Sequence, residues 1–138
     1  MVKPDHIRRS SCPVSCALDI LGDRWTLLVI RDIIFKQKRH FGDFLTSPEK
    51  IASNILSDRL KKLEDCDIVL RRPDPANARR IIYTLTEKGF DLVPAILELL
   101  RWGVKHDPAS DAHENLIQRL EQDRAGLMAE IRSSLSTV

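Results

Sequence analysis

A chain of 138 residues with 43% hydrophobic and 30% charged residues suits one globular domain with a hydrophobic core and argues against disorder. Its longest unbroken apolar run covers only residues 27–30, which excludes a membrane-spanning helix of about 20 apolar residues. Residues 106–138 carry three basic and six acidic side chains, so residues 1–105 hold a net charge of +5. This basic body permits a polyanionic partner without demanding one.

Two helices are predicted at the start of the chain. The first begins at Pro13, with Cys12 as the residue before it, and Gly22 ends it. Asp23 suits the N-cap of the next helix, residues 24–35. Apolar side chains lie nearly all round that segment, so we expect it to be the central buried helix.

A short helix and a turn come next. Residues 36–40 form a polar, basic connector, and a short helix follows at 41–45. Residues 47–50 have the composition of a turn. A further helix then begins near Ala52 or Ser53, of which Ser53 is the better cap by chemistry, and runs to about residue 65.

The hydrophobic period then changes to that of a hairpin. Residues 68–72 and 80–85 are predicted strands, and 73–78 are predicted to be a loop because prolines cannot donate to a ladder. Residues 86–105 follow as one long helix, and after a break at 108–111 a last helix runs to the C-terminus. Both tryptophans, Trp25 and Trp102, are expected in the core.

This order of elements describes a winged helix-turn-helix, so the predicted fold class is mainly α with a small β-hairpin. In the helix after the turn, three leucines form one stripe, which would dock the helix on the core: Leu56, Leu60 and Leu63. The opposite face carries amide, hydroxyl and ammonium groups, the types that bind base edges and phosphates: Asn54, Ser57 and Lys61, with Asp58, Asp65 and the flanking Lys62. The alternative is an ordinary amphipathic surface helix. Asp58 either accepts from a cytosine amino group or pairs with Lys61 or Lys62.

Four arginines bracket the tip of the hairpin: Arg71, Arg72, Arg79 and Arg80. Guanidinium groups on a projecting strand pair suit a phosphate backbone or a narrow minor groove. A charged edge that prevents sheet aggregation is the alternative. Helix and hairpin together favour double-stranded DNA, and the predicted contact residues are Ser53, Asn54, Ser57, Arg59, Lys61, Lys62, Arg71, Arg72, Arg79 and Arg80.

Several separated motifs resemble those of HxlR-type transcriptional regulators. They are the segments 12–32, 41–44, 51–64 and 83–89, together with Trp102-Gly103, and the match spans about residues 12–106. The resemblance implies a homodimer that binds an operator, usually as a repressor and sometimes as an activator. It also implies that the helix from Ser53 reads the major groove, that the hairpin tip touches the minor groove, and that the first helix and the helices after the hairpin dimerise.

The expected organisation follows from this resemblance. Residues 1–11 form an N-terminal arm, 12–106 a winged helix-turn-helix DNA-binding domain, and 107–138 a C-terminal helix for dimerisation or an accessory role. At Asp67 the family usually has glycine, and aspartate tolerates the left-handed conformation better than most residues. The segment from residue 106 onward lies beyond the resemblance.

Cys12 is the candidate sensor. A thiol at a helix N-cap meets free backbone amides that stabilise a thiolate, and Arg8, Arg9 and Arg24 would add positive potential. Such a thiolate reacts with electrophiles or oxidants, and some HxlR-type proteins use a cysteine at this place as a switch. The alternative is a purely structural Cys-Pro start.

Other functions have weaker support. The four histidines and three cysteines lie at no metal-ligand spacing, so we expect neither a metal nor another cofactor. No nucleophile has a base partner at motif spacing, which argues against an enzyme. Residues 1–11 lack the apolar core of a secretory signal, so a cytoplasmic protein is expected. A winged helix that only binds other proteins, without DNA, is the rival function.

Overall fold

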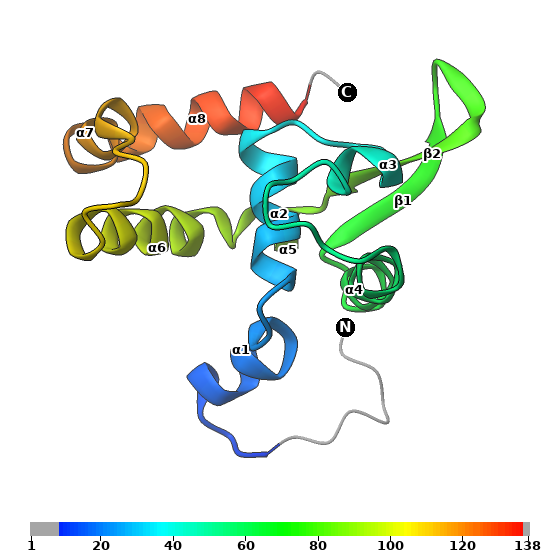
Figure 1. The fold of residues 1–138 in the computed structure, drawn as a ribbon, viewed down its shortest axis with the longest axis horizontal. Coiled ribbons are helices and arrows are strands. Elements are labelled where there is room, and N and C mark those ends of the chain that lie inside the picture. The colour runs from blue at the N-terminus through cyan, green and yellow to red at the C-terminus, as the bar shows by residue number, and fades with distance from the viewer. Residues whose placement is uncertain (1–8, 137–138) are drawn as a thin grey trace. The chain divides into compact units, whose positions relative to one another are not determined.

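The structure is a computed structural model that describes residues 9–136 (Figure 1). Its elements in chain order are α1 (Pro13–Leu21), α2 (Thr26–Phe35), α3 (Phe41–Phe44), α4 (Ser53–Asp65), β1 (Val69–Asp74), β2 (Asn77–Leu85), α5 (Glu87–Phe90), α6 (Val93–His106), α7 (Glu114–Gln122) and α8 (Arg124–Leu135). The chain divides into two compact units, one ending at Gly89 and the other beginning at Phe90. Most of the predicted N-terminal arm, residues 1–8, lies outside the described residues.

The structure confirms the first predicted helix. Helix α1 begins at Pro13 after the extended residue Cys12, and the backbone N–H of Gly22 closes it on Leu18. No side chain of α1 is buried, and Val14 and Leu18 are exposed. This helix therefore presents an apolar face that the described chain leaves open.

The predicted cap of the second helix is right in chemistry and two residues off in position. Helix α2 begins at Thr26 rather than Arg24, because Asp23 Oδ1 accepts from the backbone N–H groups of Trp25 at 2.8 Å and Thr26 at 2.9 Å. These bonds satisfy amides that a helix start otherwise leaves unpaired. Helix α2 is the central buried helix, as predicted, with Ile30 and Ile33 fully buried.

The core of the first unit combines α2 with α4 and the hairpin. The leucine stripe is confirmed, because Leu56, Leu60 and Leu63 are at most 2% exposed and α4 packs against α2 and β1. Burying three leucines contributes about 5–9 kcal/mol before conformational entropy is subtracted. The stripe fixes which face of α4 points outward.

The cap of α4 differs from the prediction. Ala52 is the N-cap residue and Ser53 lies in the first turn, with no capping bond from a side chain. The backbone bond from Leu56 N to Ala52 O, 2.9 Å long, extends the helix by the one residue that a Ser53 cap would have excluded. At its other end, Asp67 has φ 61°, so an aspartate does take the left-handed conformation there.

The hairpin is longer than predicted. Pro73 and Asp74 belong to β1, and β2 begins at Asn77 rather than Arg80, so the predicted loop 73–78 shrinks to the turn around residues 75–76. Within residues 9–136 the sheet has two strands, so both are edge strands. An edge strand tolerates Pro73 because its missing N–H need not serve the ladder.

The helix predicted over 86–105 is two helices, α5 and α6. Pro94 is in the first turn of α6. Within one continuous helix, its ring would clash with the carbonyl four residues earlier and its nitrogen would donate no bond. The chain therefore breaks around Asp91 and Leu92 and begins again, with proline where a helix accepts it.

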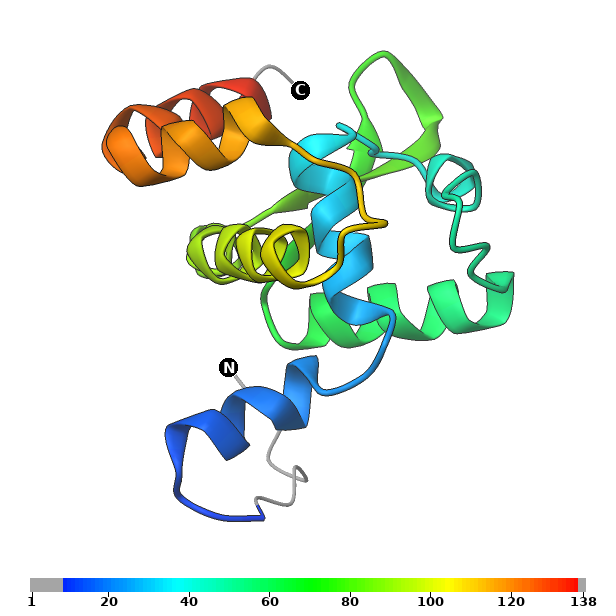
Figure 2. The ribbon, with the colours of Figure 1, turned by 60° about the vertical axis from the view of Figure 1, so that its left-hand side comes forward.

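The helix predicted for the C-terminus is also two helices. Asp123 breaks it with φ −149° and ψ 63°, and its Oδ1 accepts from the backbone N–H of Gly126 at 3.1 Å. Within the second unit, α7 and α8 pack side by side (Figure 2). The competing N-cap bond of Asp123 explains why apolar periodicity across the break did not produce one helix.

The predicted core position of Trp102 is wrong. Its side chain is 66% exposed on α6, next to Leu99 at 55%, whereas Trp25 is half-buried. Helical periodicity places both residues of α6 on one apolar face, but it does not say whether the same chain covers that face.

Within residues 9–136, every helix is too short or too polar to span a membrane.

Candidate nucleic-acid interface

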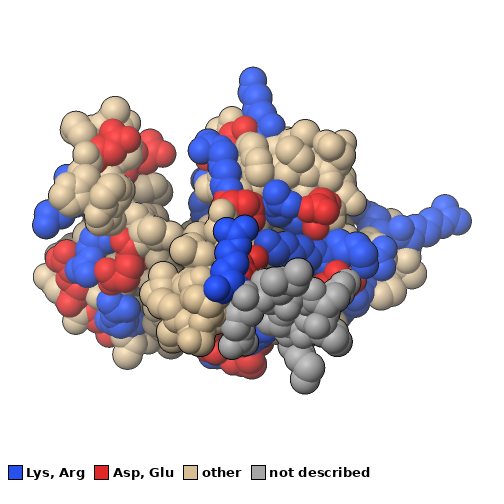
Figure 3. Space-filling model, turned by 90° about the horizontal axis from the view of Figure 1, so that it is seen from below, with Lys and Arg blue, Asp and Glu red and all other residues tan. Residues whose placement is uncertain are grey.

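The outward face of α4 carries four of the ten predicted DNA-contact residues. Ser53, Asn54, Ser57 and Lys61 are exposed. Lys61 is 72% exposed, and its Nζ lies 3.8 Å from Asp65 Oδ1, a pairing weak enough for the ammonium group to exchange for a phosphate. Basic side chains gather on the side of the first unit toward the hairpin (Figure 3).

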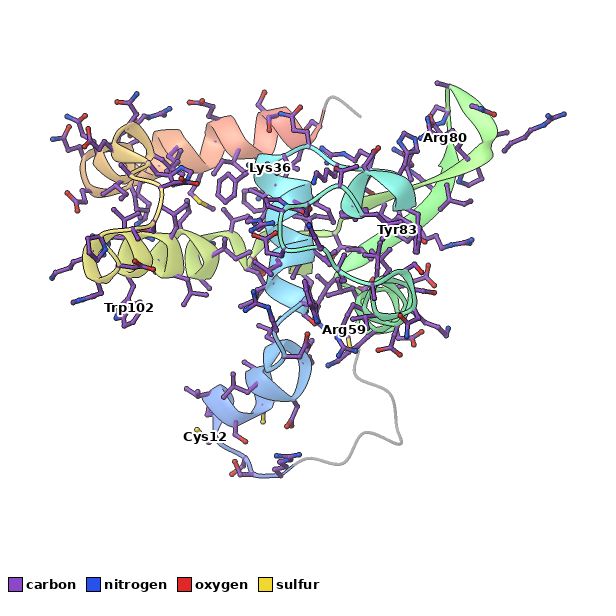
Figure 4. All side chains as sticks on the ribbon, viewed as in Figure 1. Cys12, Lys36, Arg59, Arg80, Tyr83 and Trp102 are labelled. Carbon is purple, nitrogen blue, oxygen red and sulfur yellow. The ribbon has the colours of Figure 1, made fainter. Side chains whose placement is uncertain are left out.

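Two predicted reading residues of α4 are engaged within the protein. Arg59 Nε donates to Asp23 Oδ1 at 3.0 Å, and Lys62 Nζ lies 4.0 Å from Asp23 Oδ2. Arg59 also pairs with Asp58, which corrects the expected pairing of Asp58 with Lys61 or Lys62. No local pattern signals this arrangement, because Asp23 precedes Arg59 by 36 residues. Figure 4 shows Arg59 at α4.

Asp23 is a charged junction between α2 and α4. Partial burial opposes its ionisation, but hydrogen bonds from Thr26, Trp25 and Arg59 lower its pKa to about 2. The carboxylate therefore stays charged in neutral solution and holds the start of α2 and the middle of α4 together.

The hairpin carries its arginines on the surface. Arg71, Arg79 and Arg80 are exposed, and Arg72 is half-buried. Arg71 is opposite Tyr83 in the ladder and Arg72 is opposite Ile82. Arg79 and Arg80 lie nearer the tip, and Figure 4 shows Arg80 on the projecting part of the hairpin. Guanidinium groups in these positions are available to an external anion.

The connector before α3 braces the base of the hairpin, a role that sequence reasoning missed. Arg39 O accepts from the backbone N–H of Tyr83 at 2.8 Å. The Tyr83 and Phe44 rings pack edge to face, with 6.4 Å between their centroids. The Arg39 guanidinium is buried, which lowers its pKa, and its Nη1 donates to Ile33 O at 3.0 Å and Lys38 O at 2.9 Å. In the described part of the chain, its Nε and Nη2 have no partner.

Sequence reasoning also missed a histidine at the start of α3. His40 Nε2 lies 2.7 Å from Asp74 Oδ2 of β1, and His40 Nδ1 lies 3.2 Å from Asp43 Oδ2. Hydrogen bonding to His40 lowers the pKa of Asp74. The chain thus links the start of α3 to the far end of β1 through one imidazole ring.

Cys12 stands at the N-terminus of α1 with an exposed side chain (Figure 4). The backbone N–H groups of Ser15 and Val14 lower the pKa of its thiol, although the sulfur makes no capping hydrogen bond. Cys16 is half-buried and its sulfur donates to Ser10 O at 3.4 Å, while Cys66 is buried. All three are free thiols. Arg8, expected to add charge near Cys12, lies outside the described residues.

Residues 9–136 contain no group of three or more His, Cys, Asp or Glu side chains placed to hold a metal ion. The candidate site therefore consists of a helix-turn-helix formed by α3 and α4, followed by an arginine-bearing β-hairpin. These elements define a winged helix-turn-helix.

The chain belongs to the HxlR-like helix-turn-helix family, whose sequence model matches residues 20–111. It is 39% identical over 95 residues to the HTH-type transcriptional regulator Rv3095 of Mycobacterium tuberculosis, a match that covers 69% of this chain and 59% of that protein. It is 37% identical over 92 residues to the HTH-type transcriptional regulator YodB of Bacillus subtilis, covering 66% of this chain and 81% of YodB.

Two solved structures are similar to this chain in both sequence and fold. The putative transcription factor PA1607 is 33% identical with a TM-score of 0.68, over 75% of this chain and 72% of that one. Quinone-bound YodB from B. subtilis is 32% identical with a TM-score of 0.56, over 68% of this chain and 99% of that one. These similarities confirm the winged-helix fold class.

Proposed function

We propose that this protein is a transcriptional regulator that binds a DNA operator as a homodimer and represses the adjacent gene. The observation that carries the proposal is the pairing, in one compact unit, of the exposed polar face of α4 with an arginine-bearing hairpin. Amide and hydroxyl groups on α4 suit base edges, and the arginines suit phosphates. The proposal assigns the protein no catalytic activity.

The roles of the individual residues follow from their exposure. Ser53, Asn54 and Ser57 lie in the first turns of α4 with open side chains, as a helix entering a major groove requires. Lys61 would contact phosphate. Arg71, Arg72, Arg79 and Arg80 would follow the backbone or enter the minor groove from the hairpin. Arg59 and Lys62, held by Asp23, would act mainly by fixing α4.

Dimerisation is supported by two helical faces that the described chain leaves open. Helix α1 buries none of its side chains and exposes Val14 at 67% and Leu18 at 56%. Helix α6 exposes Leu99 and Trp102. Large apolar side chains grouped on helix faces are typical of association surfaces. A second copy would cover them and bring two α4 helices to successive half-sites.

A response to electrophiles or oxidants through Cys12 is the second part of the proposal. The exposed thiol and its lowered pKa favour the reactive thiolate. One relative, YodB, has been solved with quinone bound, which suggests the class of effector to test first. Modification at the start of α1 would act on a helix that we assign to the dimer interface.

The proposed DNA binding is tested by selecting bound sequences from a random duplex pool and then measuring affinity against salt. A DNA-binding dimer selects a palindromic site, and its affinity falls log-linearly with salt. Each lost phosphate contact reduces the slope by about 0.9. Lys61→Ala and Arg79→Ala are expected to reduce it, whereas Lys36→Ala, at the far end of α2 from Asp23 (Figure 4), is the matched control.

The rival function, a winged helix that binds only other proteins, predicts a different result. The pool would yield no enriched sequence, and residual binding would not distinguish Lys61→Ala from Lys36→Ala. Asn54→Ala separates the two ideas further, because loss of a base contact lowers discrimination between sequences more than overall affinity. Unchanged sequence preference in Asn54→Ala and Ser57→Ala would remove α4 as the reading helix.

A further inference from the structure

The ladder of the hairpin becomes irregular toward its tip. Pairing is regular from Val69–Leu85 to Pro73–Ile81 and then jumps to Asp74–Asn77. The jump leaves residues 78–80 of β2 without opposite residues on β1, so Arg79 and Arg80 lie in an irregular segment. Regular strand pairing therefore does not fix the two arginines nearest the tip.

Two further side chains contact the tip. Asn77 Oδ1 accepts from the backbone N–H of Arg79 at 3.1 Å, and Asp74 contacts both the turn and His40. Its Oδ1 accepts from the backbone N–H of Ala76 at 2.8 Å, which closes the turn, and its Oδ2 lies 2.7 Å from His40 Nε2. The carboxylate side chain is only 14% exposed. Asp74 is therefore largely covered by its neighbours, and it lies close enough to Arg80 to feel its charge.

The His40 end of this contact is held by further hydrogen bonds. The backbone N–H of His40 donates to Asp43 Oδ2 at 3.1 Å, and the same oxygen lies 3.2 Å from the ring Nδ1. The preceding residue, Arg39, accepts from the backbone of Tyr83. Both imidazole nitrogens thus face carboxylate oxygens, one on α3 and one on β1, and the ring has little freedom to turn.

We propose that the His40–Asp74 contact fastens the hairpin tip to α3 and so positions Arg79 and Arg80 against DNA. This inference rests on the proposed function. Its physical basis is preorganisation, because a hairpin tip already held in place loses less conformational entropy when its arginines bind. His40 and Asp74 are positioning residues and need not touch DNA.

Two substitutions of His40 distinguish the roles of its two ring nitrogens. In His40→Gln, the side-chain amide nitrogen reaches about as far as Nε2 and keeps a donor for Asp74. In His40→Asn, the shorter side chain keeps a donor near Nδ1 for Asp43 and cannot reach Asp74. Thermal unfolding first checks that both variants fold. If His40→Asn fails to fold, Asp74→Asn replaces it, because its Oδ1 still closes the turn on Ala76 and its charge toward His40 is lost.

The first measurement needs no DNA. Amide hydrogen exchange at Ala76 and Arg79 reports how often the tip opens. We expect exchange about tenfold faster in His40→Asn than in the natural protein, a change that corresponds to one net hydrogen bond to a charged group, and nearly natural exchange in His40→Gln. Equal exchange in all three proteins overturns the contact as a fastener, whatever the protein binds.

The second measurement uses the selected operator. In the natural protein Arg80→Ala is expected to weaken binding about tenfold, a typical loss for a charge-assisted contact. In the His40→Asn background the same change is expected to cost about twofold, and in His40→Gln about tenfold again. An equal cost of Arg80→Ala in all backgrounds overturns the positioning role while leaving DNA binding intact. Failure to select any operator defeats the proposed function and leaves the exchange result standing.

Discussion

Arg59 Nε donates to Asp23 Oδ1 across 3.0 Å, which joins the middle of α4 to the residue that caps α2. Asp23 also follows directly after α1 and its closing Gly22. One carboxylate therefore contacts the helix proposed to read DNA and adjoins the helix that carries Cys12. Only Gly22 and one partly buried ion pair separate α1 from α4.

Arg59 is expected to matter for stability as well as for binding. Arg59→Ala leaves the Asp23 carboxylate without its guanidinium partner and should lower the free energy of unfolding by about 1 kcal/mol. Lys61→Ala, at a side chain that is 72% exposed, should change it by less than about 0.5 kcal/mol. Urea unfolding measures both. A larger loss of stability in Lys61→Ala than in Arg59→Ala would contradict the ion-pair assignment.

Acid should weaken the first unit through two carboxyl groups. Arg31 lowers the pKa of Glu49 to about 2, and the contacts of Asp23 lower its pKa to about 2 as well, against burial. Because both folded pKa values lie below their ordinary values, the stabilisation is present above about pH 4 and is lost as the pH falls toward 2. After solvent screening, we expect about 1 kcal/mol from each.

The pH dependence is measured as the unfolding midpoint between pH 2 and 7. Asp23→Asn and Glu49→Gln should each flatten the acid limb of this curve and lower the plateau at neutral pH. The exposed Asp91→Asn is the control. Acid limbs of the same steepness in Asp23→Asn, Glu49→Gln and the natural protein would show that these carboxyl groups are not the source.

Cys12 should be the reactive thiol of the chain. Because the N–H groups of Ser15 and Val14 lower its pKa, its labelling by iodoacetamide should titrate below the free value of about 8.5. The buried Cys66 serves as an internal control that labels only after unfolding. A Cys12 pKa at or above the free value, or an intact response of operator binding to quinone in Cys12→Ser, would remove the sensor role.

Asp123 and Gly126 should be energetically coupled. Asp123→Ala removes the cap of α8 and should cost about 1 kcal/mol. A Cβ at Gly126 would lie 2.2 Å from Asp123 Oδ2, so Gly126→Ala displaces the capping carboxylate and offsets the gain of about 1 kcal/mol from alanine in a helix. In the Asp123→Ala background that gain should appear in full. Strictly additive changes in unfolding free energy would contradict the coupling.

The sequence by itself determined the architecture and the outward face of α4. The spacing of Leu56, Leu60 and Leu63 fixed which side is buried, and the structure confirms it. The left-handed conformation of Asp67 was expected only from the resemblance to the HxlR-type family, which usually has glycine there. The turn before α4 and the hairpin were readable from the residues themselves. These features follow from local patterns, because periodicity and backbone preference act over a few residues.

Helix boundaries were readable only where local signals agreed. Pro94 divides α5 from α6 and Asp123 divides α7 from α8, although apolar residues recur at helical spacing on both sides of each break. In each case a backbone constraint or a capping bond outweighs hydrophobic periodicity. The exposure of Trp102 was not readable, because an apolar face on α6 does not reveal what covers it.

Only the tertiary structure decided how the charged residues are used. Arg59 is engaged by Asp23, and His40 meets Asp74, across 36 and 34 residues of chain. Which distant side chains meet depends on the path of the whole backbone, and hydrophobic periodicity carries no information about such pairs. The sequence alone therefore does not show that Arg59 and His40 are each paired with a distant carboxylate in the fold.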